Sequence, residues 1–240
     1  SGMGYSMNNI GNVHYYKGDY DKALDYYKRS LVVREKLGDK LGIGSVLGNI
    51  GIAHVYKGDY DTALDYFGRS LVIQEELGEK SGMGGSLNNI GLVLSNKGNH
   101  DKALDYFGRS LVICEEIGDK AGVGSSLGSI GLVHSDKGDL DKALDYYGRS
   151  LVIQEELGDK SGMGYSLNNI GNVHAAIGDY DKAVDYYGRS LVICEELGDK
   201  LGMGYSLIGI GSVHHNKGDL DKALDYHGRS LVIQEELGDK

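Results

Sequence analysis

Proline is absent from this 240-residue sequence, and only two cysteines are present. Without proline the chain lacks the commonest residue that stops a helix, so glycine must end its helices. Cys114 and Cys194 hold the same place in two repeats that are not neighbours, whereas the Cα atoms of a disulfide lie within about 7 Å. We therefore expect no disulfide between them, and a reducing, cytoplasmic setting.

The sequence also lacks a long hydrophobic run and an excess of basic residues. No apolar stretch approaches the roughly 18–20 residues that cross a bilayer, and no signal-peptide pattern opens the chain. Its 25 lysines and arginines are outnumbered by 35 aspartates and glutamates, which gives a net charge of −10. Nucleic acids and anionic membranes select basic surfaces, so we expect neither as a partner.

What the sequence does contain is a 40-residue unit, present six times without insertion or deletion. Such a period is typical of a solenoid, in which each repeat buries its apolar face only against its neighbours. Positions within a repeat are numbered here as slots 1 to 40. We predict a single array over residues 1–240, expected to be a segment of a longer protein. The repeats cover residues 1–40, 41–80, 81–120, 121–160, 161–200 and 201–240.

Each repeat contains two amphipathic patterns with helical spacing. In the first pattern, Met3, Met7 and Ile10 follow one another at intervals of four and three residues, which places them on one helix face. This first helix, helix A, ends at Gly18. Aspartates at slots 19 and 21 are expected to cap a second helix, helix B, which extends to Gly38. The sequence therefore predicts an all-α fold with twelve helices.

Glycines inside these helices each cost about 1 kcal/mol relative to alanine. Glycine is invariant at slot 11, and we expect helix B to cross helix A closely there. At slot 28 the first repeat has Lys28, and the other five have glycine. Either local flexibility or a close contact with another element explains these five glycines. They are Gly68, Gly108, Gly148, Gly188 and Gly228.

The motif within each repeat resembles that of a known family. The motif M-x2-I-G-x2-H at residues 7–14, followed by glycine at 18 and A-x3-Y at 23–27, resembles the tetratricopeptide repeat, whose pattern reads W-x2-L-G-x2-Y, A-x3-F, P. The unit differs in being 40 rather than about 34 residues long, and in replacing the proline by a longer helix B. In this form it is similar to the repeats of LGN/Pins polarity adaptors and kinesin light chains. The resemblance implies a right-handed α-solenoid with a concave groove lined by the A helices.

The six copies differ from one another mainly on one face of helix A. At about 100° per residue, slots 5, 8, 9, 12, 15 and 16 lie opposite slots 3, 7, 10 and 14, which keep packing residues. Drift after duplication would also vary exposed residues. However, slots 25, 26, 29 and 32 on the outward face of helix B are identical in every copy. We therefore interpret the varying face as a binding surface.

This varying face is rich in asparagine and tyrosine and contains no lysine or arginine. Asparagine both donates and accepts hydrogen bonds, and tyrosine adds apolar contact with a polar tip. In the LGN-like class, a similar row of asparagines grips the main chain of the ligand. Ser129 and Gly209 interrupt that row here. The candidate peptide-binding residues are Tyr5, Asn8, Asn9, Asn12, Tyr16, Asn49, Tyr56, Asn88, Asn89, Tyr165, Asn168, Asn169, Asn172 and Tyr205.

Two functional hypotheses follow from the repeats and their varying face. The leading hypothesis is a protein-interaction scaffold, or adaptor, that binds an extended, non-acidic peptide or protein segment along the A helices. The alternative is a structural module that associates with itself, because neither end of the array has a distinct polar capping helix, which solenoids generally need. Stacking of identical ends would be heterologous and could propagate.

Catalytic and metal sites are not predicted. Five histidines share slot 14, but equivalent atoms in stacked repeats should lie on the order of 10 Å apart, whereas zinc ligands converge to about 2 Å from one ion. We expect these histidines to serve in packing, and we expect no cofactor. Every candidate acid, base or nucleophile recurs in several copies, so we predict that the chain is not an enzyme. The slot-14 histidines are His14, His54, His134, His174 and His214.

Overall fold

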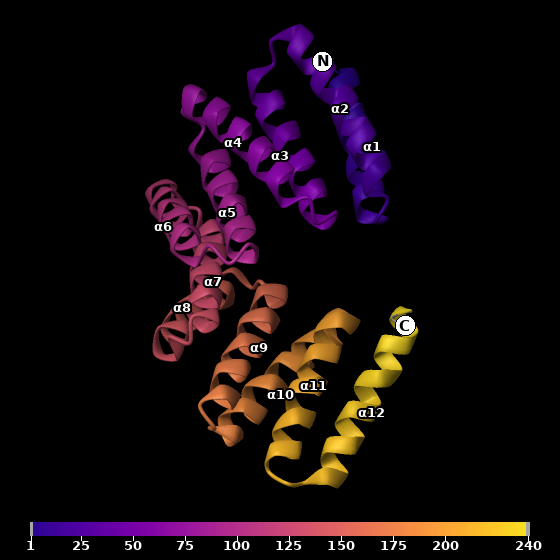
Figure 1. Cartoon of the computed structure of the whole chain (residues 1–240), viewed down its shortest axis with the longest axis vertical. Helices are drawn as coiled ribbons and strands as arrows, with labels where there is room; N and C mark the ends of the chain where they lie inside the picture. The colour runs from indigo at the N-terminus through magenta and orange to yellow at the C-terminus, as the bar shows by residue number, and fades with distance from the viewer. Residues whose placement is uncertain (1, 239–240) are drawn as a thin grey trace. The chain divides into compact units, whose positions relative to one another are not determined.

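The computed structural model describes residues 2–238, and within them it contains twelve α-helices, two for each repeat (Figure 1). The all-α prediction is confirmed. The chain divides into two compact halves, residues 1–122 and residues 123–240. The N-terminal half contains α1 (Gly2–Tyr16), α2 (Tyr20–Leu37), α3 (Lys40–Tyr56), α4 (Tyr60–Leu77), α5 (Lys80–Asn96) and α6 (His100–Ile117). The C-terminal half takes most of α7 (Lys120–Asp136), then α8 (Leu140–Leu157), α9 (Lys160–Ala176), α10 (Tyr180–Leu197), α11 (Lys200–Asn216) and α12 (Leu220–Leu237).

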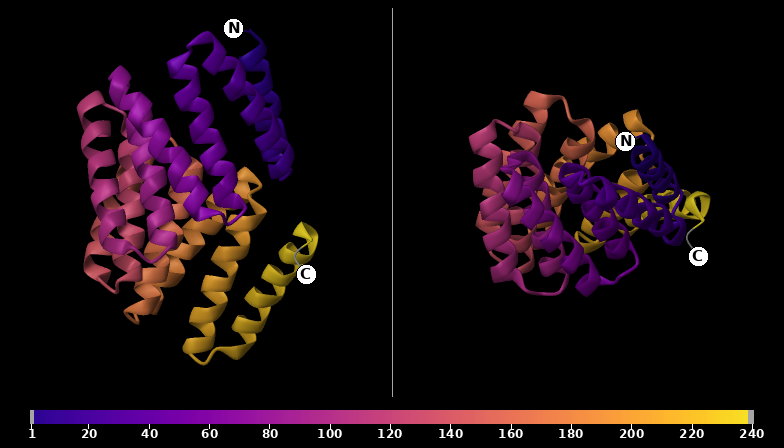
Figure 2. Two further views of the ribbon diagram at one scale, coloured as in Figure 1. Left: turned by 45° about the horizontal axis from the view of Figure 1, so that its top comes forward. Right: turned by 90° about the horizontal axis from the view of Figure 1, so that it is seen from above.

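Odd-numbered helices are the A helices and even-numbered helices are the B helices. Short turns join them throughout, as Figure 2 shows from two further directions. Of the helices in the described part of the chain, none combines the length and apolar character needed to cross a membrane.

Glycine ends the helices, as the absence of proline predicts. After α2, Gly38 adopts a left-handed φ of 67°. Its N–H donates to the Glu35 carbonyl at 3.1 Å, and the Asp39 N–H donates to the Arg34 carbonyl at 3.0 Å. These two bonds satisfy carbonyl groups that the end of a helix leaves without partners. The same positive φ recurs at slots 18 and 38 of every repeat.

Carboxylate caps are found mainly on the A helices. At the start of α3, Asp39 Oδ1 accepts from the Gly42 N–H at 3.0 Å, and equivalent bonds begin α5, α7, α9 and α11. The cap expected from Asp19 at the start of α2 is not formed. Its carboxylate instead contacts Lys22 Nζ at 3.1 Å and His14 Nδ1 at 3.5 Å. That prediction is therefore wrong for α2, α6, α8 and α12, whereas α4 and α10 keep long cap bonds.

The two helices of each hairpin cross closely at slot 11. A Cβ atom on Gly51 would lie 2.6 Å from the ring of Phe67, which is closer than packed atoms can approach. In every repeat the ring at slot 27 lies in the same way against the glycine at slot 11. The invariant glycine thus has the packing role that the sequence predicts.

The glycines at slot 28 have no such role. Around Gly188 on α10, a Cβ atom would find no neighbour within 4 Å, and the same holds for the other four slot-28 glycines. A close contact within the described chain is therefore not the reason for these glycines.

A buried serine at slot 30 ties helix B to helix A. Ser70 Oγ donates to the Gly44 carbonyl at 2.8 Å. The equivalent bond is formed in every other repeat, at 2.6 to 3.3 Å. Because each of these carbonyls also accepts the helical N–H four residues later, the serine supplies a second hydrogen bond, which contributes about 0.5–1.5 kcal/mol.

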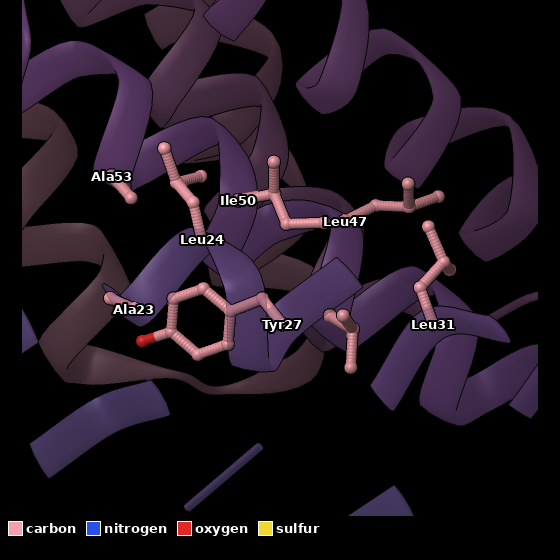
Figure 3. Close-up of a cluster of buried hydrophobic side chains, with 8 residues drawn as sticks. Ala23, Leu24, Tyr27, Leu31, Leu47, Ile50 and Ala53 are labelled. Carbon is pink, nitrogen blue, oxygen red and sulfur yellow. The ribbon is translucent and has the colours of Figure 1, made fainter. Parts of the chain in front are cut away.

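Neighbouring hairpins pack the B helix of one repeat onto the A helix of the next. In the N-terminal half, Ala23, Leu24, Tyr27 and Leu31 of α2 face Leu47, Ile50 and Ala53 of α3 (Figure 3). Equivalent clusters join α4 to α5, α8 to α9 and α10 to α11. Full burial of one such side chain contributes roughly 1.5–3 kcal/mol. Each hairpin thus gains its core from its neighbours, as expected of a solenoid.

Candidate functional site

The predicted residues of the fifth repeat come together around a hollow of about 480 Å³ in the C-terminal half. The hollow lies between α9 and α11 and has α10 as its floor. Ser190 and Cys194 form the floor, and Asp199 lines the side towards the start of α11. The predicted residues that line this hollow are Tyr165, Asn168, Asn169, Asn172 and Tyr205.

An equivalent hollow of about 480 Å³ lies in the N-terminal half, between α3 and α5 over α4. Two predicted residues line it, Asn49 and Asn89. Ser45 and Gly85 stand where the other hollow has tyrosines, and Gln74 takes the place of Cys194 on the floor. The same structural position therefore carries two different chemistries in one chain.

Some of the asparagines bind each other. Asn49 Nδ2 donates to Asn8 Oδ1 at 3.0 Å, which links slot 8 of one repeat to slot 9 of the next. In the C-terminal half this link is broken, because glycine occupies slot 8 before Asn169 and slot 9 after Asn168. Among the described residues, no partner satisfies the buried Asn168 Oδ1 or the buried Asn169 Nδ2. One acceptor and one donor of residues that line the hollow are thus buried without a partner.

Asn12 and Asn172 have partners inside their own repeats. The Tyr27 hydroxyl donates to Asn12 Oδ1 at 2.8 Å, and the Tyr187 hydroxyl donates to Asn172 Oδ1 at 2.7 Å. Burial raises the pKa of both tyrosines to about 12, so both remain neutral donors. Repeats with phenylalanine at slot 27 have an apolar residue at slot 12, although the fourth repeat pairs a tyrosine with Leu132. Variation at slot 12 therefore partly reflects internal packing.

The remaining predicted residues do not line either hollow. Tyr56 packs on Tyr15 and Tyr20, with ring centroids 5.4 and 5.5 Å apart, and Tyr16 packs on Tyr15 at 5.4 Å. These rings form an aromatic cluster at the ends of α1 and α3 and the start of α2. The other residues outside the two hollows are Tyr5, Asn8, Asn9, Asn12 and Asn88.

Slots 30 and 34 of helix B were not predicted to line a binding surface. Slot 34 varies between copies as arginine, glutamine or cysteine, and this variation was the available signal. In the first repeat the slot holds a basic residue, Arg34, whose Nη1 lies 2.5 Å from Asp39 Oδ2. The varying face of helix A contains no basic residue. The arginine at slot 34 belongs to helix B, and its charge is neutralised by Asp39.

The slot-14 histidines serve in packing, as predicted. Each stacks on the tyrosine at slot 26 of its own repeat, with centroids 5.3–5.6 Å apart, and places Nδ1 within 3.2–3.7 Å of the aspartate at slot 19. Burial lowers the pKa of His174, and the bond from Lys182 lowers the pKa of Asp179. The third repeat replaces both members of the pair, with Leu94 and Asn99.

We compared the sequence and the structure of this chain with those of known proteins. None of the curated proteins matches the chain. Among solved structures, BtubC (BKLC) from P. vanneervenii is 19% identical with a TM-score of 0.79, covering 92% of this chain and 93% of that one. The Rap conjugation gene regulator of plasmid pLS20, in complex with the Phr* peptide, is 17% identical with a TM-score of 0.74, covering 98% and 74%. The nearly identical TPR-like repeats of a Podosopora anserina putative kinesin light chain are 12% identical with a TM-score of 0.64, covering 81% and 96%.

These likenesses show a shared fold. The sequence itself matches the tetratricopeptide repeat over residues 3–76, 83–156 and 162–236, which is most of its length. Hairpins that cross at an invariant glycine and pack only on their neighbours agree with that match. The chain belongs to the tetratricopeptide repeat family.

Proposed function

We propose that this chain is a non-catalytic protein-interaction scaffold that binds an extended, non-acidic peptide along its A helices. The observation that carries the proposal is the pair of unsatisfied side-chain groups in α9, Asn168 Oδ1 and Asn169 Nδ2. Leaving such a group without a hydrogen bond costs about 1–3 kcal/mol. A peptide main chain supplies both a donor and an acceptor, so one bound peptide can satisfy both groups once the two amides turn towards the hollow that their residues line.

The charges around the two hollows favour a ligand that is not acidic. Glu79 lines the hollow of the N-terminal half and Asp199 lines that of the C-terminal half. The cation at slot 34 of the first repeat is already paired with Asp39. A Rap regulator with a similar fold is in complex with a peptide, which supports the same use of the fold here.

A direct test starts from a random dodecapeptide library selected on the immobilised chain. The affinities of selected peptides are then compared between the wild type and a variant with Asn49→Ala, Asn89→Ala and Asn169→Ala. We expect the variant to bind at least about tenfold more weakly, since each hydrogen bond contributes about 0.5–1.5 kcal/mol. The matched control is Asn99→Ala, an exposed asparagine before α6 that forms no cap bond and lines neither hollow. A folded triple variant with unchanged affinity would overturn the proposal.

A second candidate function is self-association, which the exposed end faces favour. On α12, Leu224 is 72% exposed, although leucine at this slot is buried or half-buried in the first four repeats. On α1, Met3 and Val13 are exposed. The contact of α2 with α3 is the template for a junction between α12 of one copy and α1 of the next. In that template, Lys57 of the second repeat forms an ion pair with Asp21 of the first. In a stack of two copies, Lys17 of one copy would form the equivalent ion pair with Asp221 of the other.

We expect the mass measured by light scattering to rise above 25.9 kDa as the concentration of the chain increases. A variant with Leu224→Glu and Leu231→Glu should stay monomeric, because it places charge on the apolar face of α12. Both leucines are already exposed, so these changes should not unfold the chain. A constant monomer mass for the wild type up to millimolar concentration would contradict this second function.

A further inference from the structure

The chain itself shows how a guanidinium group fills the space between two neighbouring A helices above a B helix. In the first repeat, Arg34 extends from α2 between α1 and α3, and its side chain is 13% exposed. Arg34 Nη1 lies 2.5 Å from Asp39 Oδ2, and Nε lies 3.4 Å from Ser30 Oγ. Glycines at Gly4 and Gly42 make room for it, since a Cβ atom on either would press against the arginine.

The fifth repeat keeps this setting but lacks the arginine. Cys194 occupies the slot of Arg34, and its short side chain leaves the hollow of about 480 Å³ open. Asp199 Oδ1 accepts from the Gly202 N–H at 3.1 Å, just as Asp39 Oδ1 accepts from Gly42. The carboxylate is therefore oriented by the same cap. Within residues 2–238, Asp199 forms no ion pair.

The walls of the hollow suit a planar cation. Tyr165 on α9 and Tyr205 on α11 line it, and both rings are more than half exposed. Guanidinium groups stack favourably on tyrosine rings, and this chain does so in every repeat, as with Arg189 at 5.3 Å from the centre of the Tyr186 ring. Asn168 also lines the hollow, and its buried Oδ1, which has no partner among the described residues, becomes a further acceptor when the amide turns towards the ligand.

We propose that the hollow between α9 and α11 binds an arginine side chain of the partner peptide, with its guanidinium group taking the position that Arg34 holds in the first repeat. This inference rests on the proposed function. Arginine is favoured over lysine because its planar, five-donor group can bond to several acceptors and stack on a ring at once. The hollow of the N-terminal half, although it has the same structural position, is not expected to bind arginine, since it lacks the tyrosines and Gln74 occupies its floor.

The test uses pools of random dodecapeptides whose central residue is arginine, lysine, leucine or citrulline, the uncharged isostere of arginine. We expect the wild-type chain to bind the arginine pool at least about tenfold more tightly than the citrulline pool, because hydrogen bonds to charged groups are about twice as strong as neutral ones. Asp199→Asn should remove this preference, since asparagine keeps the helix cap but not the charge. The matched control is Asp159→Asn, which changes an equivalent cap carboxylate that does not line the hollow.

A second variant, Cys194→Arg, supplies the guanidinium from within the chain. It should pair with Asp199 as Arg34 pairs with Asp39, and should abolish the preference for the arginine pool. If this variant does not fold, the outcome of Asp199→Asn decides alone. Equal binding of the arginine and citrulline pools overturns this inference and leaves the peptide-binding function standing. Failure to bind any pool overturns both.

Discussion

Replacing Phe67 by alanine is expected to lower the free energy of unfolding by about 3–5 kcal/mol. Phe67 is 1% exposed and is part of the cluster in which α4 packs on α5, with Leu87 and Ile90. Its ring also lies directly against Gly51, so truncation opens a cavity between three helices that cannot collapse fully. Urea unfolding followed by circular dichroism measures the loss.

The control for Phe67→Ala is the same slot in the sixth repeat, which holds His227. This residue is exposed on α12, because no further helix among the described residues covers it. His227→Ala should cost clearly less, no more than about 1 kcal/mol, because the ring contacts Gly211 but is otherwise exposed. Similar losses for the two variants would mean that burial between hairpins is not what holds the repeats together.

Replacing all five slot-28 glycines by alanine is expected to raise the free energy of unfolding by about 4–5 kcal/mol. Each glycine inside a helix is about 0.8–1.0 kcal/mol less favourable than alanine, and the added methyl groups meet no neighbour. The first repeat already carries Lys28 at this slot, so a side chain is accepted there. The measurement is the shift of the urea midpoint in the variant with Gly68, Gly108, Gly148, Gly188 and Gly228 all changed to alanine.

A glycine in the same hairpin serves as the control of opposite sign. Gly171→Ala on α9 makes the same chemical change as Gly188→Ala on α10. However, its Cβ atom would lie 2.7 Å from the Tyr187 ring, and overpacking typically costs about 1–3 kcal/mol. We expect Gly188→Ala to stabilise the chain and Gly171→Ala to destabilise it. Stabilisation by both would show that intrinsic helix preference, rather than packing, governs these positions, and destabilisation by both would contradict the open space found around Gly188.

Much of the fold could be predicted because it depends on local periodicity. The spacing of Met3, Met7 and Ile10 specifies a helix face, and glycines at slots 18 and 38 end the helices wherever they occur. Repetition then adds information that one copy lacks. A glycine kept at slot 11 in all six copies, despite its cost in a helix, predicts a close crossing, and the ring of Phe67 against Gly51 is that crossing.

The candidate site was predicted less completely, because its hydrogen bonds depend on residues one repeat away. Asn49 and Asn169 occupy the same slot, yet Asn49 is bound to Asn8 while Asn169 Nδ2 has no partner in the described chain. The repeat before Asn49 has Asn8 at slot 8, whereas the repeat before Asn169 has Gly128 there. That pairing becomes visible only when slot 8 and the next slot 9 are known to touch.

The sequence by itself determined the number and type of helices, their ends and the face on which they pack, because backbone preferences and apolar spacing act within a few residues. Only the tertiary structure decided which polar groups lack hydrogen-bond partners and which residues form the floor of each hollow. Arg34 and Cys194 share a slot, but the side chains around them come from neighbouring helices. Whether such a position is filled or hollow depends on contacts between hairpins, which no single repeat encodes.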